Sequence, residues 1–121
     1  MAIDAKYALI VSMDVDPAYE ELFNEVYDTE HIPYLLKVPG VRSATRLKGR
    51  PFVLAAGGEL KEMPAPSPAY TAIYELDHPD VLKSPEWARA LEAGRWNTDV
   101  RPHTKNRSHG VFATRSVQSP E

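Results

Sequence analysis

The hydrophobic and polar positions at the start of the chain predict a strand followed by a helix. Residues 6–15, KYALIVSMDV, are mostly apolar and β-prone, which is typical of a strand. Asp16 is a favourable N-cap and Pro17 suits the first helical position, so a helix is expected to begin there. Apolar residues then recur at helical spacing and mark the face that this helix buries. They are Tyr19, Leu22, Phe23 and Val26.

Pro33 predicts where this helix is interrupted. A proline has no amide hydrogen and disfavours helical geometry at the residue before it, so the helix is expected to break or kink near His31. Residues 35–36 fit one final turn before Pro39 and Gly40 redirect the chain.

Three further strands and a second helix follow. Residues 41–48 alternate as a strand with one charged side does, and residues 70–76, YTAIYEL, predict a third strand. The triplet 84–86, Ser-Pro-Glu, is a helix-start signal, and this helix is expected to close near Gly94. Residues 108–117 predict the last strand.

The segment between the second and third strands reads as a loop. Residues 49–68 contain Gly57, Gly58 and the run MPAPSP. These residues predict a long Pro/Gly-rich loop insertion, with a short strand at 52–55 as one option.

The order of the elements is β-α-β-β-α-β, the pattern of a ferredoxin-like α+β fold. We expect one domain over residues 1–121, with a four-stranded antiparallel sheet, two helices on one face and the last strand beside the second. The helices leave the other face uncovered, although about half of its expected residues are apolar. A second copy of the chain is expected to bury that face as a homodimer.

Composition narrows the function classes. The 121 residues include 43% apolar and 26% charged residues, with a net charge of -3, and give no electrostatic reason to expect nucleic acid or an anionic membrane. The basic residues of the last third are interleaved with acids, which indicates a solvated surface. The chain has no cysteine, which excludes disulfides and thiolate chemistry. Its N-terminus lacks a long apolar run, so a cytoplasmic protein is expected.

Residues 27–46, YDTEHIPYLLKVPGVRSATR, resemble the signature of the dimeric α+β barrel superfamily, especially its EthD-like and related uncharacterised members. That signature has an aromatic-acid-x-x-His-x-Pro segment, a Pro-Gly turn and a strand with arginine. Residues 69–87 and 101–112 are also similar to this group, whereas residues 49–68 fit no pattern in it. Tyr27 stands where a tryptophan is common. The resemblance implies a dimer, but the superfamily includes cyclases, isomerases, cofactor-free monooxygenases and haem enzymes.

His31 is the candidate proton-transfer residue, because it is the only histidine of the first helix and titrates near neutral pH. Tyr27 and Asp28 precede it by four and three residues, so both neighbour it on a helix surface. Asp28 is expected to fix the imidazole tautomer, while Tyr27 or Tyr34 donates a hydrogen bond to a substrate oxygen. The alternative is that His31 only satisfies the helix end by bonding a carbonyl.

Other side chains are candidates for binding the substrate. Arg46 is either an anion clamp or a salt-bridge partner of Asp28 or Glu30 that pins helix to strand. Each remaining candidate either lines the pocket or serves as a core, anchor or dimer contact. These candidates are Tyr70, Tyr74, Trp87, Trp96 and His109, with His103 as a further histidine near the last strand.

These features favour a cofactor-independent enzyme of the isomerase, cyclase or lyase type. Its substrate is expected to be a small, mostly apolar carbonyl or phenolic compound, with His31 as general base or acid. Neither a cofactor nor a metal is expected, since the chain lacks phosphate-loop, dinucleotide and metal-ligand motifs. The competing hypothesis is a non-catalytic binding protein for a hydrophobic metabolite, or an accessory subunit of a degradative pathway.

Overall fold

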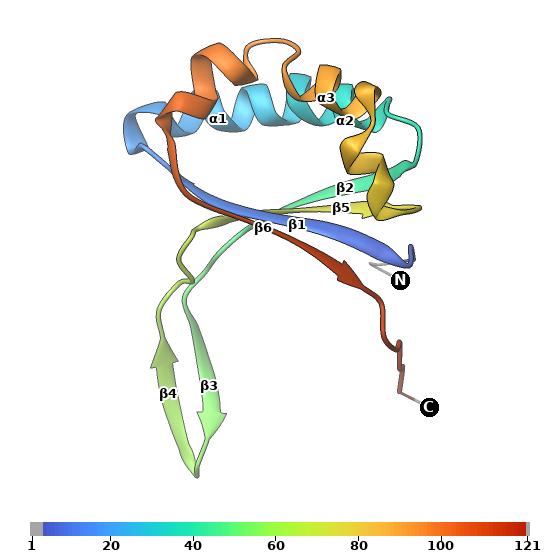
Figure 1. Ribbon diagram of the computed structural model, residues 1–121. Coiled ribbons are helices and arrows are strands. Elements are labelled where there is room, and N and C mark those ends of the chain that lie inside the picture. Colours follow the sequence, from blue (N-terminus) through green and yellow to red (C-terminus); the bar gives the residue numbers. More distant parts are fainter. Residues whose placement is uncertain (1–3, 121) are drawn as a thin grey trace.

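The computed structural model describes residues 4–120, which form a four-stranded antiparallel sheet with all helical segments on one face (Figure 1). The strands of the sheet lie in the order β2-β5-β1-β6. Their bounds are β1 Tyr7–Val15, β2 Val41–Lys48, β5 Tyr70–Leu76 and β6 Thr104–Ala113. The α-helices are α1 Glu20–Val26, α2 Ile32–Leu36 and α3 Pro85–Leu91. No helix within residues 4–120 is long and apolar enough to cross a membrane.

The first helical segment loses its regular α geometry next to His31, where a break or kink was predicted, but the chain stays helical past Pro33. Between α1 and α2 lies a π-helical turn, η2 (Tyr27–His31), in which the Ile32 amide donates to the Tyr27 carbonyl. The wider turn changes the hydrogen-bond register just before the proline, which then occupies the first turn of α2, where its missing amide hydrogen is tolerated. The helical direction therefore continues to Leu36.

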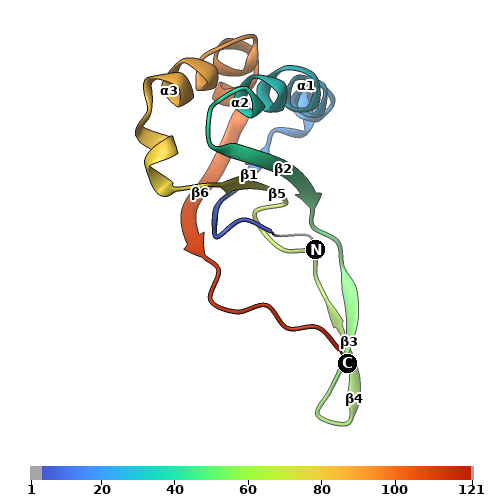
Figure 2. The same ribbon diagram turned by 90° about the vertical axis from the view of Figure 1, so that its right-hand side faces the viewer.

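A β-hairpin replaces the loop predicted at residues 49–68. Its strands are β3 (Phe52–Ala56) and β4 (Glu59–Met63), joined through Gly57 and Gly58. Both glycines have positive φ, 62° and 79°, as a tight hairpin turn requires. The strand option at 52–55 is thus confirmed, while β4 was missed. We call residues 50–68 the arm; it extends away from the uncovered face of the sheet (Figures 1 and 2).

The arm joins the sheet through a narrow neck. The Gly49 amide donates to the Ala69 carbonyl at 2.7 Å, directly beyond the last paired residues of β2 and β5. A side chain at Gly49 would have its Cβ 2.5 Å from Cγ of Pro66, so only glycine fits there. The neck therefore continues the pairing of the sheet and fixes where the arm begins.

The core lies between the sheet and the helices. Phe23 and Val26 of α1 are fully buried, which confirms the buried face predicted for the first helix. Alternate residues of the central strands face them, as the two-residue period of a strand requires. These sheet residues are Leu9, Val11, Met13, Tyr70, Ala72, Tyr74 and Leu76.

The prediction that the last strand lies beside the second is wrong. Strand β6 pairs with β1, with Val11 opposite His109 and Leu9 opposite Val111. His109 and Val111 therefore share the helix-facing side with these two core residues. The opposite face carries Phe112, which is 57% exposed.

Candidate functional site

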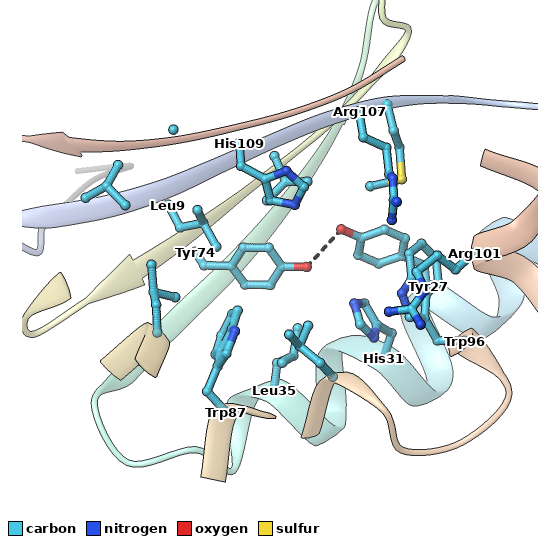
Figure 3. Close-up of a pocket in the computed structure, with 16 residues that line it drawn as sticks. Leu9, Tyr27, His31, Leu35, Tyr74, Trp87, Trp96, Arg101, Arg107 and His109 are labelled. Atoms are coloured by element: carbon cyan, nitrogen blue, oxygen red, sulfur yellow. Dashed lines mark hydrogen bonds between the residues drawn. The ribbon is translucent and has the colours of Figure 1, made fainter. Parts of the chain in front are cut away.

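A cavity of about 400 Å³ lies between the helices and the β1–β6 half of the sheet (Figure 3). Its size is within the range of small-molecule sites. Both halves of the chain contribute to this cavity. Its walls come from β1, β5 and β6, from the helical segments η2, α2 and α3, and from Trp96. The lining residues are Leu9, Val11, Met13, Tyr27, His31, Leu35, Tyr74, Leu82, Trp87, Leu91, Trp96, Arg101, Arg107, His109, Gly110 and Val111.

His31 lines this cavity from the π turn η2 and is only 3% exposed. It therefore lies at a cavity, as the proton-transfer hypothesis requires. Its Nδ1 atom is buried and has no hydrogen-bond partner among the described residues. A buried polar atom without a partner costs free energy, so a hydrogen bond to this nitrogen from a ligand that reached it would be favourable.

Burial also determines the charge of His31. It lowers the pKa of the imidazole from 6.5 to about 4, and the nearby positive charge of Arg101 adds to this effect. At neutral pH the ring is uncharged, so one nitrogen carries a lone pair that can accept a proton. The environment opposes the resulting cation unless a ligand supplies negative charge.

Tyr27 and Tyr74 place two phenol groups beside His31. Their hydroxyl oxygens are 2.8 Å apart and hydrogen-bonded, as Figure 3 shows. Burial raises the pKa of both phenols above the ordinary value, so both are neutral. Each neutral phenol has one hydrogen to donate, and the pair uses only one of the two. The second hydroxyl hydrogen is therefore left for a ligand oxygen.

A second π turn, η4 (Trp96–Val100), packs against His31 through Trp96. The indole of Trp96 stacks on the imidazole, with ring centroids 4.3 Å apart and 19° between their planes. The ring of Tyr27 meets both of them edge-on. Such π turns often occur at functional sites, and here each one carries an aromatic or imidazole wall of the cavity.

Six residues predicted for the site meet at this cavity: Tyr27, His31, Tyr74, Trp87, Trp96 and His109. Asp28, Tyr34, Arg46 and Tyr70 are not among its lining residues.

Asp28 does not orient His31, and that part of the prediction is wrong. Its carboxylate accepts a hydrogen bond from Arg46 at 3.0 Å, while Nδ1 of His31 has no partner. The alternative interpretation of Arg46 is confirmed: it links β2 to the first helical segment through Asp28 and Asn24. Its guanidinium also lies 4.4 Å from the ring centroid of Tyr27, on the side away from the cavity lining.

The other predicted residues outside the cavity have their own partners. Tyr70 donates to Glu20, and Tyr34 is exposed with Lys37 above its ring. His103 stacks on Tyr19 at the far end of the first helical segment.

The two charged residues of the cavity lining, Arg101 and Arg107, were not predicted as site residues. Both belong to a stretch of charges that was interpreted as solvated surface. A usable signal was present, because Arg107 and His109 are two residues apart and residues at that spacing share one side of a strand. Within residues 4–120, no group of three or more His, Cys, Asp or Glu side chains is arranged to hold a metal ion.

Comparison with known proteins identifies the fold. No family model and no curated protein matches the sequence. The structure is similar to the crystal structure of an ethyl tert-butyl ether D (EthD) family protein from Bacillus halodurans, with a TM-score of 0.55 and 14% identity. The similarity covers 90% of this chain and 99% of that chain. The chain therefore has an EthD-like α+β fold, as the resemblance in residues 27–46 predicted.

Proposed function

We propose that this chain, with its EthD-like fold, is a cofactor-independent enzyme that transfers a proton on a small, mostly apolar carbonyl or phenolic compound. The observation that carries the proposal is His31, a neutral and buried imidazole that lines the cavity and whose Nδ1 has no partner among the described residues. Because Nδ1 of His31 has no partner among the described residues, binding a ligand there would break no existing hydrogen bond.

The chemistry that this arrangement supports is removal of a proton next to a carbonyl group. The lone pair of His31 takes the proton, the electrons of the C–H bond move onto the carbonyl, and an enolate oxygen results. The free hydroxyl hydrogen of the Tyr27–Tyr74 pair then stabilises that oxygen. Return of the proton from His31 to another carbon gives an isomer, and expulsion of a leaving group gives a lyase reaction.

A binding protein without turnover is the second candidate, and the lowered pKa of His31 favours it. An imidazole with a pKa of about 4 is a weak base in the empty cavity. Under this alternative the vacant nitrogen accepts a hydrogen bond from a phenol or an acid, and no proton is transferred.

Hydrogen exchange separates the two candidates. Phenylacetone has acidic C–H groups next to its carbonyl, and exchange of these hydrogens in D₂O can be followed by NMR. The enzyme proposal expects protein-catalysed exchange that is lost in His31→Phe. If phenylacetone binds, as measured by thermal shift, but exchanges only at the uncatalysed rate, the binding-protein candidate is favoured.

We also propose that two copies of the chain form a dimeric α+β barrel by packing their sheets together. No helix of the described residues covers the second face of the sheet, where Phe112 and Leu47 are largely exposed (Figure 2). Ile10 and Ile73 alternate with core residues on the neighbouring strands and therefore also point to that face. Light scattering tests this proposal: the expected mass is about twice 13.5 kDa. A monomer in dilute solution would refute it.

A further inference from the structure

The charged groups around the cavity are all of one sign. Among its lining residues, none is Asp or Glu, while Arg101 and Arg107 are both positive. Arg101 already binds both carboxylate oxygens of Glu92, at 3.3 Å each, so part of its charge is compensated. Arg107 forms no ion pair with any carboxylate of residues 4–120. The cavity lining thus includes an exposed arginine, Arg107, without a carboxylate partner among these residues.

Arg107 and His109 lie next to each other above the polar end of the cavity. They are alternate residues of β6, and both line the cavity on the side of the sheet that faces the helices. In Figure 3 the guanidinium of Arg107 extends towards Tyr27, and the imidazole of His109 lies over the ring of Tyr74. His31 lies on the opposite side of the tyrosine pair (Figure 3).

The other end of the cavity is apolar. Trp87 and Leu35 lie away from Arg107 and Arg101 in Figure 3. Leu82 and Leu91 add further apolar lining from the segments around α3. The cavity therefore suits an amphipathic molecule with a hydrocarbon or aromatic body and one polar end.

From this distribution we infer that the ligand carries a carboxylate, which Arg107 and His109 bind while its apolar body contacts Trp87. A guanidinium binds a carboxylate through two parallel N–H···O bonds, and an imidazole N–H adds a third donor. The inference rests on the proposed function and deepens it, because it makes the substrate class an aryl or alicyclic carboxylic acid with an acidic C–H or O–H group.

A bound carboxylate also counteracts the two effects that lower the pKa of His31. Arg101 and burial both oppose a positive imidazole in the empty cavity. A negative charge on the ligand favours that cation, so the pKa of the imidazole is expected to rise when the acid is bound. The site would then be most active on the molecules that it binds best.

A matched pair of ligands tests the inference. Phenylacetate and phenylacetamide have nearly the same shape, but only the acid is charged at neutral pH. Titration calorimetry at low salt is expected to show that phenylacetate binds at least about tenfold more tightly. Arg107→Gln should remove this preference while leaving the affinity for the amide unchanged. Arg89→Gln is the matched control, since Arg89 is an exposed arginine outside the cavity lining.

Three outcomes would overturn the carboxylate inference. They are equal affinity for the acid and the amide, no binding of phenylacetate at millimolar concentration, and an acid preference that persists in Arg107→Gln. The proposed function is judged separately, by the exchange of phenylacetone, which has no carboxylate. Loss of exchange in His31→Phe with no acid preference in the wild type would refute the carboxylate subsite alone. An acid preference with no catalysed exchange of either phenylacetone or phenylpyruvate, which has both a carboxylate and an acidic C–H group, would refute the enzyme proposal alone.

Discussion

The imidazole of His31 stacks on the indole of Trp96, with 4.3 Å between the ring centroids. This contact joins two π turns that are far apart in the sequence, η2 and η4. The nitrogen lone pair of an imidazole lies in the plane of the ring, so a ring held by stacking on its face still presents its nitrogen at the edge. Trp96 therefore fixes the plane of the base without blocking the vacant atom.

Replacing His31 by Phe should separate chemistry from stability. Phenylalanine retains a ring against Trp96 and removes the unsatisfied Nδ1, so the melting temperature of the empty protein should stay the same or rise. Loss of a general base should lower the exchange rate about 10²–10⁴-fold. His103→Phe is the matched control, because His103 also stacks on an aromatic ring but lies outside the cavity lining. A lower melting temperature with full exchange activity would make His31 a structural residue.

The buried imidazole should also make stability dependent on pH. The pKa of His31 is about 4 when folded, against 6.5 when exposed, so the unfolded chain takes up the proton first as the pH falls. Its contribution to the free energy of unfolding is complete above pH 6.5 and is lost progressively down to about pH 4, by ~3 kcal/mol in total. Urea unfolding at several pH values measures this. The difference between wild type and His31→Phe isolates it from the carboxylates, and a constant difference over that range would refute it.

The Tyr27–Tyr74 pair should behave as one unit. Tyr27→Phe or Tyr74→Phe removes the hydrogen bond and leaves one buried hydroxyl without its partner, at a cost of about 1–3 kcal/mol. Once one hydroxyl is gone, removing the second no longer breaks the bond, so the double variant should lose less than the sum. Thermal unfolding of the four proteins measures this coupling. Additive losses would show that the pair does not act together.

Arg46 should contribute to stability and not to ligand binding. Arg46→Met keeps an apolar side chain and removes both the guanidinium over Tyr27 and its bonds to Asp28 and Asn24. Because Asp28 is largely exposed, the expected loss is about 1–2 kcal/mol of unfolding free energy. Affinity for phenylacetate should not change, which is the opposite of the result expected for Arg107→Gln. Weaker phenylacetate binding in Arg46→Met would show that Arg46 does contribute to ligand binding.

The arm should be dispensable for the fold of one chain. Replacing residues 50–68 by Asn-Gly would join Gly49 to Ala69 through a two-residue hairpin turn, which the antiparallel pairing of β2 with β5 allows. Thermal unfolding should remain cooperative. The exposed Phe52, Val53 and Leu60 of the arm indicate a role in the proposed dimer, so light scattering should give the mass of one chain. A dimer that persists would show that the sheet face alone holds the two copies.

Local patterns predicted most of the fold. Strand and helix signals indicated the four strands of the sheet and the buried face of the first helix, because alternation and helical spacing depend only on neighbouring residues. The last strand was predicted four residues too late, at 108–117, whereas β6 spans Thr104–Ala113. The hairpin was underestimated, since β4 reads ELKEM and is exposed throughout, so no buried face organises its sequence. The Gly57–Gly58 pair was the one available turn signal.

The parts of the site that depend on residues close together in the sequence were predicted. Spacing placed Tyr27 beside His31 correctly, but it could not show that Asp28 would bond to Arg46 from another strand. Arg107 entered the site only because β6 pairs with β1, and that pairing is set by the whole sheet. The sequence therefore did not predict which charged residues, far apart along the chain, would contact one another or line the cavity.

The neck at Gly49 and Ala69 makes the arm a suitable place to insert a peptide tag or a label. The chain enters the arm after Gly49 and leaves it at Ala69, and these two residues share one backbone hydrogen bond. The number of residues in the arm therefore does not change the register of β2 against β5. The entropic cost of a longer loop grows only with the logarithm of its length. A peptide tag or a fluorescent label inserted between Gly57 and Gly58, far from the cavity, would report on association of two chains without disturbing ligand binding.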